Sequence, residues 1–237
     1  MNKKCLLLLV MLFVGITASQ AQLYCGETKF DGEHKNEVEG YLQFGKNQVT
    51  GTFFGPMASY KRHFTDRWSA SGAVEAPFGK GKFSLYAKGG YRLPAGYFNF
   101  YFTGKFMYCR YGRFGTNEFN YNICVVWEAP YFDITLGDTF INYRLLGDGH
   151  WEPLTLQAGI GVNIRPRWNS WNIGLYARNY DEFYYENWNI NWGVRFNASI
   201  MKTLKLFGEF NIRPAGSISQ LATKYETSLK VGVKYVW

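Results

Sequence analysis

Polar side chains, many of them charged, alternate with apolar ones in segments along most of this 237-residue chain. In the last such segment, Lys230 and Lys234 alternate with Leu229, Val231 and Val233. Two kinds of chemistry suit a row of this type. Rings of Arg and Lys select anions along a water-filled path. Alternatively, acids and bases on one enclosed surface pair with each other and stiffen it, because a buried charge needs a partner. The sequence alone leaves both interpretations open.

The candidate residues share one property: each is charged and lies on the polar face of an alternating segment. Basic residues predominate among them, which favours a mild preference for anionic solutes. The candidates are Lys88, Arg92, Lys105, Glu118, Glu128, Asp133, Arg165, Arg178, Arg195, Lys205, Glu209, Arg213, Glu226, Lys230 and Lys234.

Hydrolytic chemistry would need a histidine or serine with an orienting partner. The chain has three histidines, His34, His63 and His150, and Asp148 lies close to His150 in sequence. No serine stands beside His150, and no lipase-type motif is present. We therefore expect no enzymatic activity, with a lipid hydrolase as the less favoured alternative.

Metal, cofactor and nucleic-acid sites have no support in the sequence. Cys25, Cys109 and Cys124 show no zinc-type spacing, and their odd number predicts no complete disulfide framework. We expect neither a metal nor an organic cofactor. The formal net charge is +8, yet no basic run or nucleic-acid motif appears, so nucleic acid is not an expected partner.

The elements that position the charged residues are predicted strands, because apolar and polar residues alternate with period two. They number about twelve, with ten as the alternative count. Glycine with proline suggests a bulge near residues 55–56, and an acid on the apolar face suggests a bulge or strand end near Gly137. The expected strands are 38–44, 49–60, 68–78, 83–93, 98–108, 119–127, 132–136, 154–164, 173–177, 188–198, 204–212 and 229–237.

Two features indicate that the apolar face points outward into lipid. The expected strands run for about ten residues, which is the length that spans a membrane. Aromatic residues also gather at strand ends, as interfacial girdles do. One expected girdle is Trp68, Tyr91, Trp127, Trp171 and Trp237, and the other is Phe78, Tyr108, Phe119 and Trp188. The fold class is therefore all-β, a transmembrane antiparallel β-barrel over residues 36–237.

The N-terminus has the three parts of an export signal. Lys3 and Lys4 precede an apolar run over residues 5–18, and small residues follow, so we expect cleavage after Ala21. The signal peptide would then be 1–21 and the N-terminal segment 22–35. No other segment approaches the ~18 apolar residues of a transmembrane helix.

The last strand carries a more specific resemblance. Leu229, Val231, Val233 and Tyr235 lead at alternate positions to a terminal Trp237. This resembles the C-terminal signature of bacterial outer-membrane β-barrel proteins, which usually ends in Phe. The resemblance implies these five residues as an assembly signal read by the β-barrel assembly machinery. It further implies location in the cell outer membrane, with lipid and lipopolysaccharide as partners.

An even number of strands puts both chain ends on the periplasmic side. The segment 22–35 then lies in the periplasm or enters the lumen. His34 and His63 become periplasmic and His150 extracellular. The expected extracellular loops are 78–81, 110–117, 144–153, 180–186 and 214–224. The loop 180–186 is aromatic and acidic and offers a surface for recognition.

Three functions remain. The favoured one is a narrow passive channel for small, mildly anionic solutes, because about twelve strands lie between a filled small barrel and a wide porin. The alternative is a closed structural or surface-recognition barrel. The lipid hydrolase is less favoured. The sequence gives no basis for an oligomeric state or for naming a solute.

Overall fold

The computed structural model describes residues 35–47, 51–79, 81–112, 115–145, 148–166, 169–181, 184–185, 190–213 and 225–237. Its long strands are β1 (Asn36–Asn47), β2 (Gly51–His63), β3 (Trp68–Glu75), β4 (Lys82–Ala95), β5 (Phe98–Tyr111), β6 (Thr116–Glu128), β7 (Phe132–Leu145), β8 (Asp148–Asn163), β9 (Trp171–Arg178), β12 (Asn191–Ser199), β13 (Leu204–Arg213) and β14 (Glu226–Val236). Two short strands, β10 (Tyr180–Asp181) and β11 (Tyr184–Tyr185), form a separate small hairpin.

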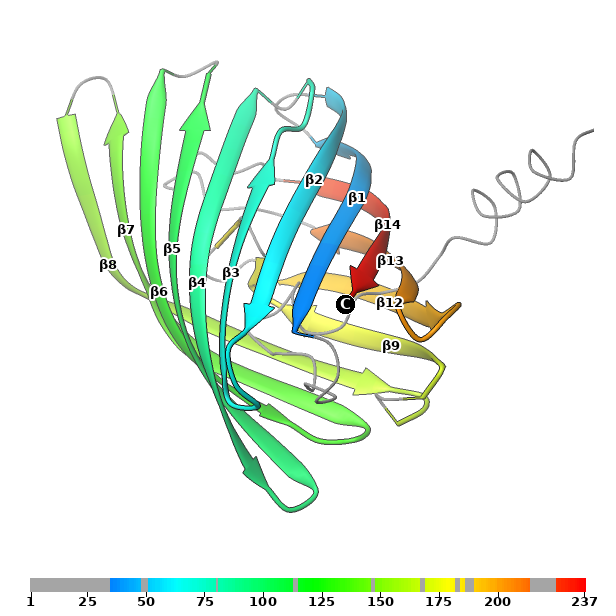
Figure 1. Ribbon diagram of the computed structural model, residues 1–237. Helices are drawn as coiled ribbons and strands as arrows, with labels where there is room; N and C mark the ends of the chain where they lie inside the picture. The colour runs from blue at the N-terminus through cyan, green and yellow to red at the C-terminus, as the bar shows by residue number, and fades with distance from the viewer. Residues whose placement is uncertain are drawn as a thin grey trace, which may run out of the picture.

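The twelve long strands close into one antiparallel barrel (Figure 1). Each strand pairs with the next along the chain, and β1 closes the circle by pairing with β14. Closure gives every long strand a neighbour on both sides, as a bilayer requires. The sequence prediction of about twelve strands is confirmed, and the alternative of ten is wrong.

Burial along the strands is the reverse of that in a soluble protein. In β1 the apolar Val38, Leu42 and Phe44 are exposed on the outside, while Glu39 and Gln43 are buried inside. The same alternation runs through the other long strands whose side chains are described. An apolar exterior around a polar interior is the arrangement of a membrane-spanning barrel.

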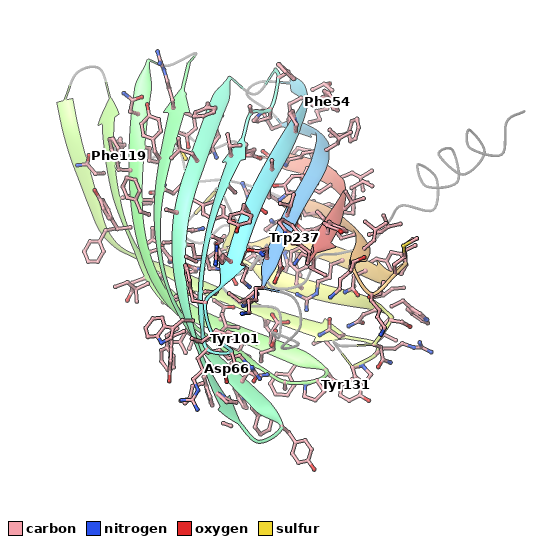
Figure 2. The ribbon with its side chains drawn as sticks, viewed as in Figure 1. Phe54, Asp66, Tyr101, Phe119, Tyr131 and Trp237 are labelled. Carbon is pink, nitrogen blue, oxygen red and sulfur yellow. The ribbon has the colours of Figure 1, made fainter. Side chains whose placement is uncertain are left out.

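Both ends of the barrel chain meet at one rim, which we call the chain-end rim. The backbone amides of Lys35 and Asn36 donate to the carbonyl oxygen of Trp237, at 3.0 and 2.9 Å. Aromatic rings gather at this rim, where Trp68 packs on Tyr91 with ring centroids 4.8 Å apart. Figure 2 labels Trp237 and Tyr131 towards this rim and Phe54 and Phe119 near the other.

The opposite rim carries the second girdle. Phe54 packs between Phe44 and Phe78, with ring centroids 4.9 and 6.5 Å apart. Further round the barrel, Tyr108 packs on Phe119 at 5.2 Å. Trp188, expected in this girdle, lies outside the described residues. The aromatic girdles predicted from the sequence are therefore present where the structure describes them.

Of the two expected strand irregularities, the structure has one. β2 alternates without interruption through Gly55 and Pro56, since Phe53 and Met57 are apolar residues that point inward. β7 continues to Leu145, and its register against β8 shifts between Thr139 and Ile141. The bulge expected near Gly137 is therefore present, two residues further on.

Two other boundaries differ from the sequence prediction. The expected loop 144–153 is mostly strand, because β7 ends at Leu145 and β8 begins at Asp148. The backbone of His150 therefore pairs with that of Tyr143 inside the sheet. The expected exposed loop 180–186 starts with Tyr180, whose side chain is buried inside the barrel; residues 182, 183 and 186 lie outside the described residues.

The wall has one short ladder, between β8 and β9. Pairing covers only Gly159–Asn163 of β8, and towards the opposite rim it stops at the Gly159–Arg178 pair. Asn179 follows Arg178 in the chain, and its side-chain amide forms hydrogen bonds with the backbone of β8. Its Nδ2 donates to the Leu156 carbonyl at 2.5 Å, and its Oδ1 accepts from the Ala158 amide at 2.9 Å. One side chain thus replaces the missing strand contacts at this point.

Candidate functional site: the charged interior

Most of the predicted lumen residues lie on the inner wall of the barrel. Buried on the inner wall are Lys88, Lys105, Glu118, Glu128, Asp133, Arg178, Arg195, Glu209, Arg213, Glu226, Lys230 and Lys234. Arg92 and Lys205 are half-buried near the chain-end rim. Arg165 lies beyond the end of β8 and stacks on the exposed ring of Trp171, 3.8 Å from its centroid, so it belongs to the rim instead. A role in conduction stays a prediction for all of them.

One ion-pair cluster joins β1, β2 and β14 near the chain-end rim. The carboxylate of Glu37 accepts from Lys234 Nζ at 3.0 Å and contacts His63 Nε2 at 2.7 Å. Lys61 Nζ lies 3.9 Å away from the same carboxylate, and Lys234 also reaches Glu39 at 3.8 Å. All five side chains are buried, so the mutual pairing offsets the loss of hydration.

A second cluster lies along β9, β13 and β14. Arg178 Nη2 donates to Glu209 Oε1 at 2.8 Å, and Lys230 Nζ lies 3.7 Å from the same oxygen. The guanidinium of Arg178 also stacks over the ring of Tyr176 at 4.1 Å. Both partners of the Arg178–Glu209 pair have no exposed side-chain surface, so this bond is shielded from bulk water.

A third pair crosses two intervening strands. Arg195 on β12 donates from Nη2 to Asp133 Oδ1 on β7 at 2.7 Å. The arginine side chain passes over Gly174 of β9 and Gly161 of β8. A Cβ atom at either glycine would lie 2.7 Å from an arginine nitrogen. The glycines therefore leave a track along the inner wall, which is the close backbone approach that glycine allows in a strand.

Sequence reasoning missed several inward charges. Glu37 precedes the first expected strand, Glu39 lies inside it, and Lys61 lies one residue past the second. Their alternation with Val38 and Tyr60 was the available signal. With these residues included, the described interior holds nine buried bases (Lys61, Lys82, Lys88, Lys105, Arg178, Arg195, Arg213, Lys230, Lys234) and eight buried acids (Glu37, Glu39, Glu75, Glu118, Glu128, Asp133, Glu209, Glu226). The interior is nearly balanced in charge.

An apolar layer interrupts this charged interior, and we call it the aromatic belt. Within it Tyr41 and Phe207 meet edge to face with centroids 5.9 Å apart. Lysines lie against its rings: Lys230 Nζ is 5.6 Å from the Tyr41 centroid, and Lys105 Nζ is 5.4 Å from that of Tyr86. The belt consists of Tyr41, Met57, Tyr86, Met107, Cys109, Tyr111, Ile141, Tyr176, Tyr180 and Phe207.

Two buried amide side chains in the same interior have no hydrogen-bond partner in the protein. Asn172 and Asn191 are at most 1% exposed, and neither the nitrogen nor the oxygen of either amide has a protein partner. Leaving a buried amide without a hydrogen bond costs about 1–3 kcal/mol per group. Water is the partner that such buried groups ordinarily take.

Two lysines stand directly opposite each other on the β4–β5 wall. Lys88 and Lys105 are register partners, and both face the interior. Like charges at directly opposed positions destabilise a sheet, so a pair of this kind calls for negative charge nearby.

The two described cysteines differ in state. Cys109 is a free thiol, and its sulfur accepts a hydrogen bond from Ser84 Oγ at 3.3 Å. Cys124 is disulfide-bonded, and its sulfur lies 3.1 Å from the Thr103 hydroxyl, which must donate because a disulfide sulfur carries no hydrogen.

The groups considered for hydrolysis do not form a catalytic arrangement in the described part. His63 is engaged with Glu37, as described above. His34 lies outside the described residues, and the side chain of His150 is not described. Among the described residues, no group of three or more His, Cys, Asp or Glu could hold a metal ion. No helix among them is long and apolar enough to cross a membrane.

No protein-family model matches this chain, and no curated protein matches it. Solved structures are similar to it, among them these three. KdgM porin in complex with disordered oligogalacturonate has a TM-score of 0.58 and 11% identity, covering 85% of this chain and 99% of that one. NanC porin has a TM-score of 0.55 and 11% identity, covering 83% and 98%. An active-site mutant of outer membrane phospholipase A from Escherichia coli has a TM-score of 0.52 and 10% identity, covering 92% and 98%.

At these identities the similarity concerns the fold alone. A porin and a phospholipase share it, so the function must be read from the site. The closed twelve-strand barrel, its apolar exterior and its matches agree. The chain has the fold of the bacterial outer-membrane β-barrel proteins.

Proposed function

We propose that this protein is a narrow passive channel for small polar solutes in the outer membrane. The observation that carries the proposal is the presence of polar groups in the interior whose hydrogen bonds the protein does not supply. The buried amides of Asn172 and Asn191 have no protein partner, which is favourable only where water enters.

The charge arrangement supports the same proposal. Buried ion pairs generally add little stability compared with well-packed apolar residues. An interior that holds seventeen buried charges therefore serves a purpose other than stability alone. Conduction of polar solutes is such a purpose, because charged walls replace part of a solute's hydration. Similarity to the KdgM and NanC porins is consistent with this function.

The preferred solutes are mildly anionic. The near balance of buried acids and bases argues for weak selectivity, and the Lys88–Lys105 pair gives that selectivity its sign. The aromatic belt narrows the path, so only small solutes would pass.

A closed barrel is the second candidate, and the aromatic belt with its buried tyrosines is the observation that favours it. In that case the ion pairs would stiffen the wall, and the protein would act through its surface. An enzymatic role has less support, because no serine stands beside His150 in the sequence and the ring of His63 is hydrogen-bonded to Glu37.

The cellular setting completes the proposal. We infer that residues 1–21 are removed as a signal peptide with cleavage after Ala21, and that both barrel ends face the periplasm. The outward-facing row Leu229, Val231, Val233, Tyr235 and Trp237 then serves as the assembly signal. Outer-membrane lipid, lipopolysaccharide and the assembly machinery are the expected partners.

Single-channel recording in planar bilayers tests the function. A channel gives discrete conductance steps, and a potassium chloride gradient gives a reversal potential of the sign expected for weak anion preference. Consistent silence over many verified insertions would show that the closed-barrel alternative is correct.

A further inference from the structure

The lipid-facing wall over β8, β9 and β12 is hollowed, and we call this hollow the outer groove. It lies on the outside of the barrel, because Ile160, Leu175 and Trp192 in its lining are each more than half exposed, whereas the charged side chains point inward. The outer groove is therefore separate from the lumen. Its cavity volume is about 430 Å³, and its lining includes Ile160, Val162, Leu175, Ala177, Trp192 and Val194.

Strand register explains why the wall is hollow at this point. On the outer face Ala177 of β9 stands between Ile160 of β8 and Trp192 of β12, its two register partners. A methyl group between two large side chains makes the floor of the groove low. A second hollow of about 460 Å³ shares Ile160 and Ala177 and has a further small residue, Ala158, in its lining. Both volumes are those of sites that hold small molecules.

The lining of the outer groove is uncharged, with aliphatic and aromatic residues predominating. A polar occupant would lose its hydration there without gaining a charged partner, which is unfavourable. An apolar chain loses nothing on entry and gains contacts with the walls on both sides of Ala177. The groove therefore fits a flexible hydrocarbon chain.

Positive charge gathers at the chain-end rim beside the groove. The connection 164–170 leads from β8 to β9, and the connection 200–203 leads from β12 to β13. The two are neighbours, because the amide of Ser199 donates to the carbonyl oxygen of Ser170 at 2.6 Å. Of the described bases here, Lys202 is exposed and Arg165 half-buried. Over 163–171 and 199–205 the sequence has no acid, and its bases are Arg165, Arg167, Lys202 and Lys205.

The guanidinium of Arg165 is held in a position that suits a phosphate. It lies 3.8 Å from the centroid of the exposed Trp171 ring. Stacking occupies the flat face of a guanidinium, whereas its N–H donors point outward in the plane. Donors arranged in this way bind phosphate in pairs. Tryptophan is enriched at the level of lipid headgroups, so Arg165 lies where a headgroup phosphate would be.

We propose that the outer groove binds an acyl chain of an anionic phospholipid, whose phosphate lies on Arg165 and Lys202. Basic residues at the membrane surface attract anionic headgroups, and here they stand beside an apolar groove. The chain-end rim faces the periplasm in the function proposed above, and the periplasmic leaflet of an outer membrane consists of phospholipid. The site is a second function of the wall and does not depend on conduction through the lumen.

The dimensions agree with this placement. Along β9, Leu175 stands four residues and Ala177 six residues from Trp171. At about 3.3 Å per residue, these separations are roughly 13 and 20 Å along the strand. A tilt of about 45° reduces them to depths of roughly 9 and 14 Å. One leaflet contributes about 15 Å of the hydrocarbon core, so a chain anchored at this rim ends beside Ala177.

Photolabelling tests the groove. The full barrel is placed in phosphatidylcholine vesicles with a small share of phosphatidylglycerol that carries a diazirine near the end of one acyl chain. Labelled peptides, mapped by mass spectrometry, should come mainly from β8, β9 and β12. Ala177→Phe fills the floor of the groove and should reduce these labels several-fold. Ala87→Phe, at an exposed alanine on the outside of β4, is the matched control and should leave them unchanged.

Both substitutions face lipid, so the barrel should form in each variant, and heat-modifiable gel mobility verifies this. Labels spread evenly around the barrel would overturn the proposal, as would labels in the groove that Ala177→Phe does not reduce. A second copy of this chain is the rival occupant. Crosslinks between two copies at β9, in place of lipid labels, would show that the groove is a contact between copies.

Lipid retention tests the charges. The barrel is released from nanodiscs with equal parts of phosphatidylglycerol and phosphatidylcholine, and native mass spectrometry identifies the lipids that stay bound. Wild type should retain phosphatidylglycerol in several-fold excess. The double variant Arg165→Gln with Lys202→Gln should lose this excess, whereas Lys46→Gln, on the outside of β1, should keep it.

Equal retention of both lipids by wild type would overturn the anionic headgroup. An unchanged excess in the double variant would overturn the position of the phosphate on Arg165 and Lys202. Neither result bears on the channel, because conductance depends on the lumen and the groove lies outside it.

Discussion

Arg195 and Asp133 form a 2.7 Å ion pair although β9 and β8 lie between their strands in the sheet. Asn163 joins the pair by accepting from the same arginine nitrogen at 3.1 Å. The Arg195 side chain thus ties β12 to β8 and β7 and crosses β9 on the inner wall. The tie spans the β8–β9 ladder, which is short, and so reinforces the wall where backbone pairing is scarce.

The glycine track should be sensitive to a single methyl group. Gly161→Ala places a Cβ 2.7 Å from both Arg195 Nη2 and Asp133 Oδ1. We expect destabilisation of about 1–3 kcal/mol, as overpacking of a filled interior usually costs. Urea unfolding in detergent or vesicles, followed by tryptophan fluorescence, measures it. Gly104→Ala is the matched control, because nothing lies within 4 Å of its Cβ; equal losses in both variants would contradict the track.

The ion pair itself should show energetic coupling. Asp133→Asn leaves a buried guanidinium without its carboxylate, which should cost about 3 kcal/mol. Adding Arg195→Gln removes the stranded charge, so the double variant should lose less than the sum of the two single losses. A double-mutant cycle of unfolding free energies gives the coupling, expected at about 1–3 kcal/mol. Strict additivity would mean that the two side chains do not interact.

The lysine pair should set the sign of ion selectivity. Replacing Lys88 and Lys105 by Gln removes two positive charges from the inner wall, so the reversal potential should move towards cation preference. Lys46→Gln is the matched control, because Lys46 is exposed on the outside of β1. An unchanged reversal potential in the Lys88/Lys105 variant would assign the selectivity to other residues.

Asn179 should protect the backbone of β8. In Asn179→Ala, the Leu156 carbonyl and the Ala158 amide lose their partners in an apolar setting, at about 1–3 kcal/mol for each group. Hydrogen exchange of the Ala158 amide should therefore become faster. Amides in the paired part, Gly159–Asn163, serve as the internal control. Unchanged protection at Ala158 would show that another group closes this point of the wall.

The terminal aromatic residue should matter for assembly more than for the final fold. Trp237 stacks on Tyr235 with ring centroids 5.6 Å apart and lies 6.4 Å from the Tyr60 ring, whereas its backbone carbonyl closes the barrel. Trp237→Ala keeps that backbone bond, so it should fold slowly but to the same barrel. Insertion into vesicles holding the assembly machinery, scored by heat-modifiable gel mobility, measures the rate. Trp237→Phe should insert at the normal rate. A normal rate for the alanine variant would show that Trp237 is not part of an assembly signal.

Much of the interior escaped prediction for a definite reason. Period-two alternation assigns each residue to a face, and it did so for Glu209 and Lys230, but it cannot say which charges meet. The Arg195–Asp133 pair joins residues 62 positions apart, and only the closed sheet with its glycine track brings them together. Cys124 is similar, since its spacing indicates no partner.

The bulge expected near Gly55 is absent for a physical reason. It was expected because glycine and proline interrupt the alternation of polar and apolar residues there. Met57 is buried inside the barrel because the interior holds an aromatic belt as well as charges. Alternation in a sequence reports polarity, and polarity matches the face only where each face has one kind of environment.

By itself, the sequence determined the architecture: long alternating strands, about twelve in number, with an apolar exterior and aromatic girdles. These are properties of each strand and its immediate neighbours, so local pattern suffices. The tertiary structure alone decided the ion-pair partners, the aromatic belt, the short β8–β9 ladder and the close approach of Gly137 to Cys124. Each of these depends on strand register and barrel closure, which bring distant residues to one wall and which no local pattern encodes.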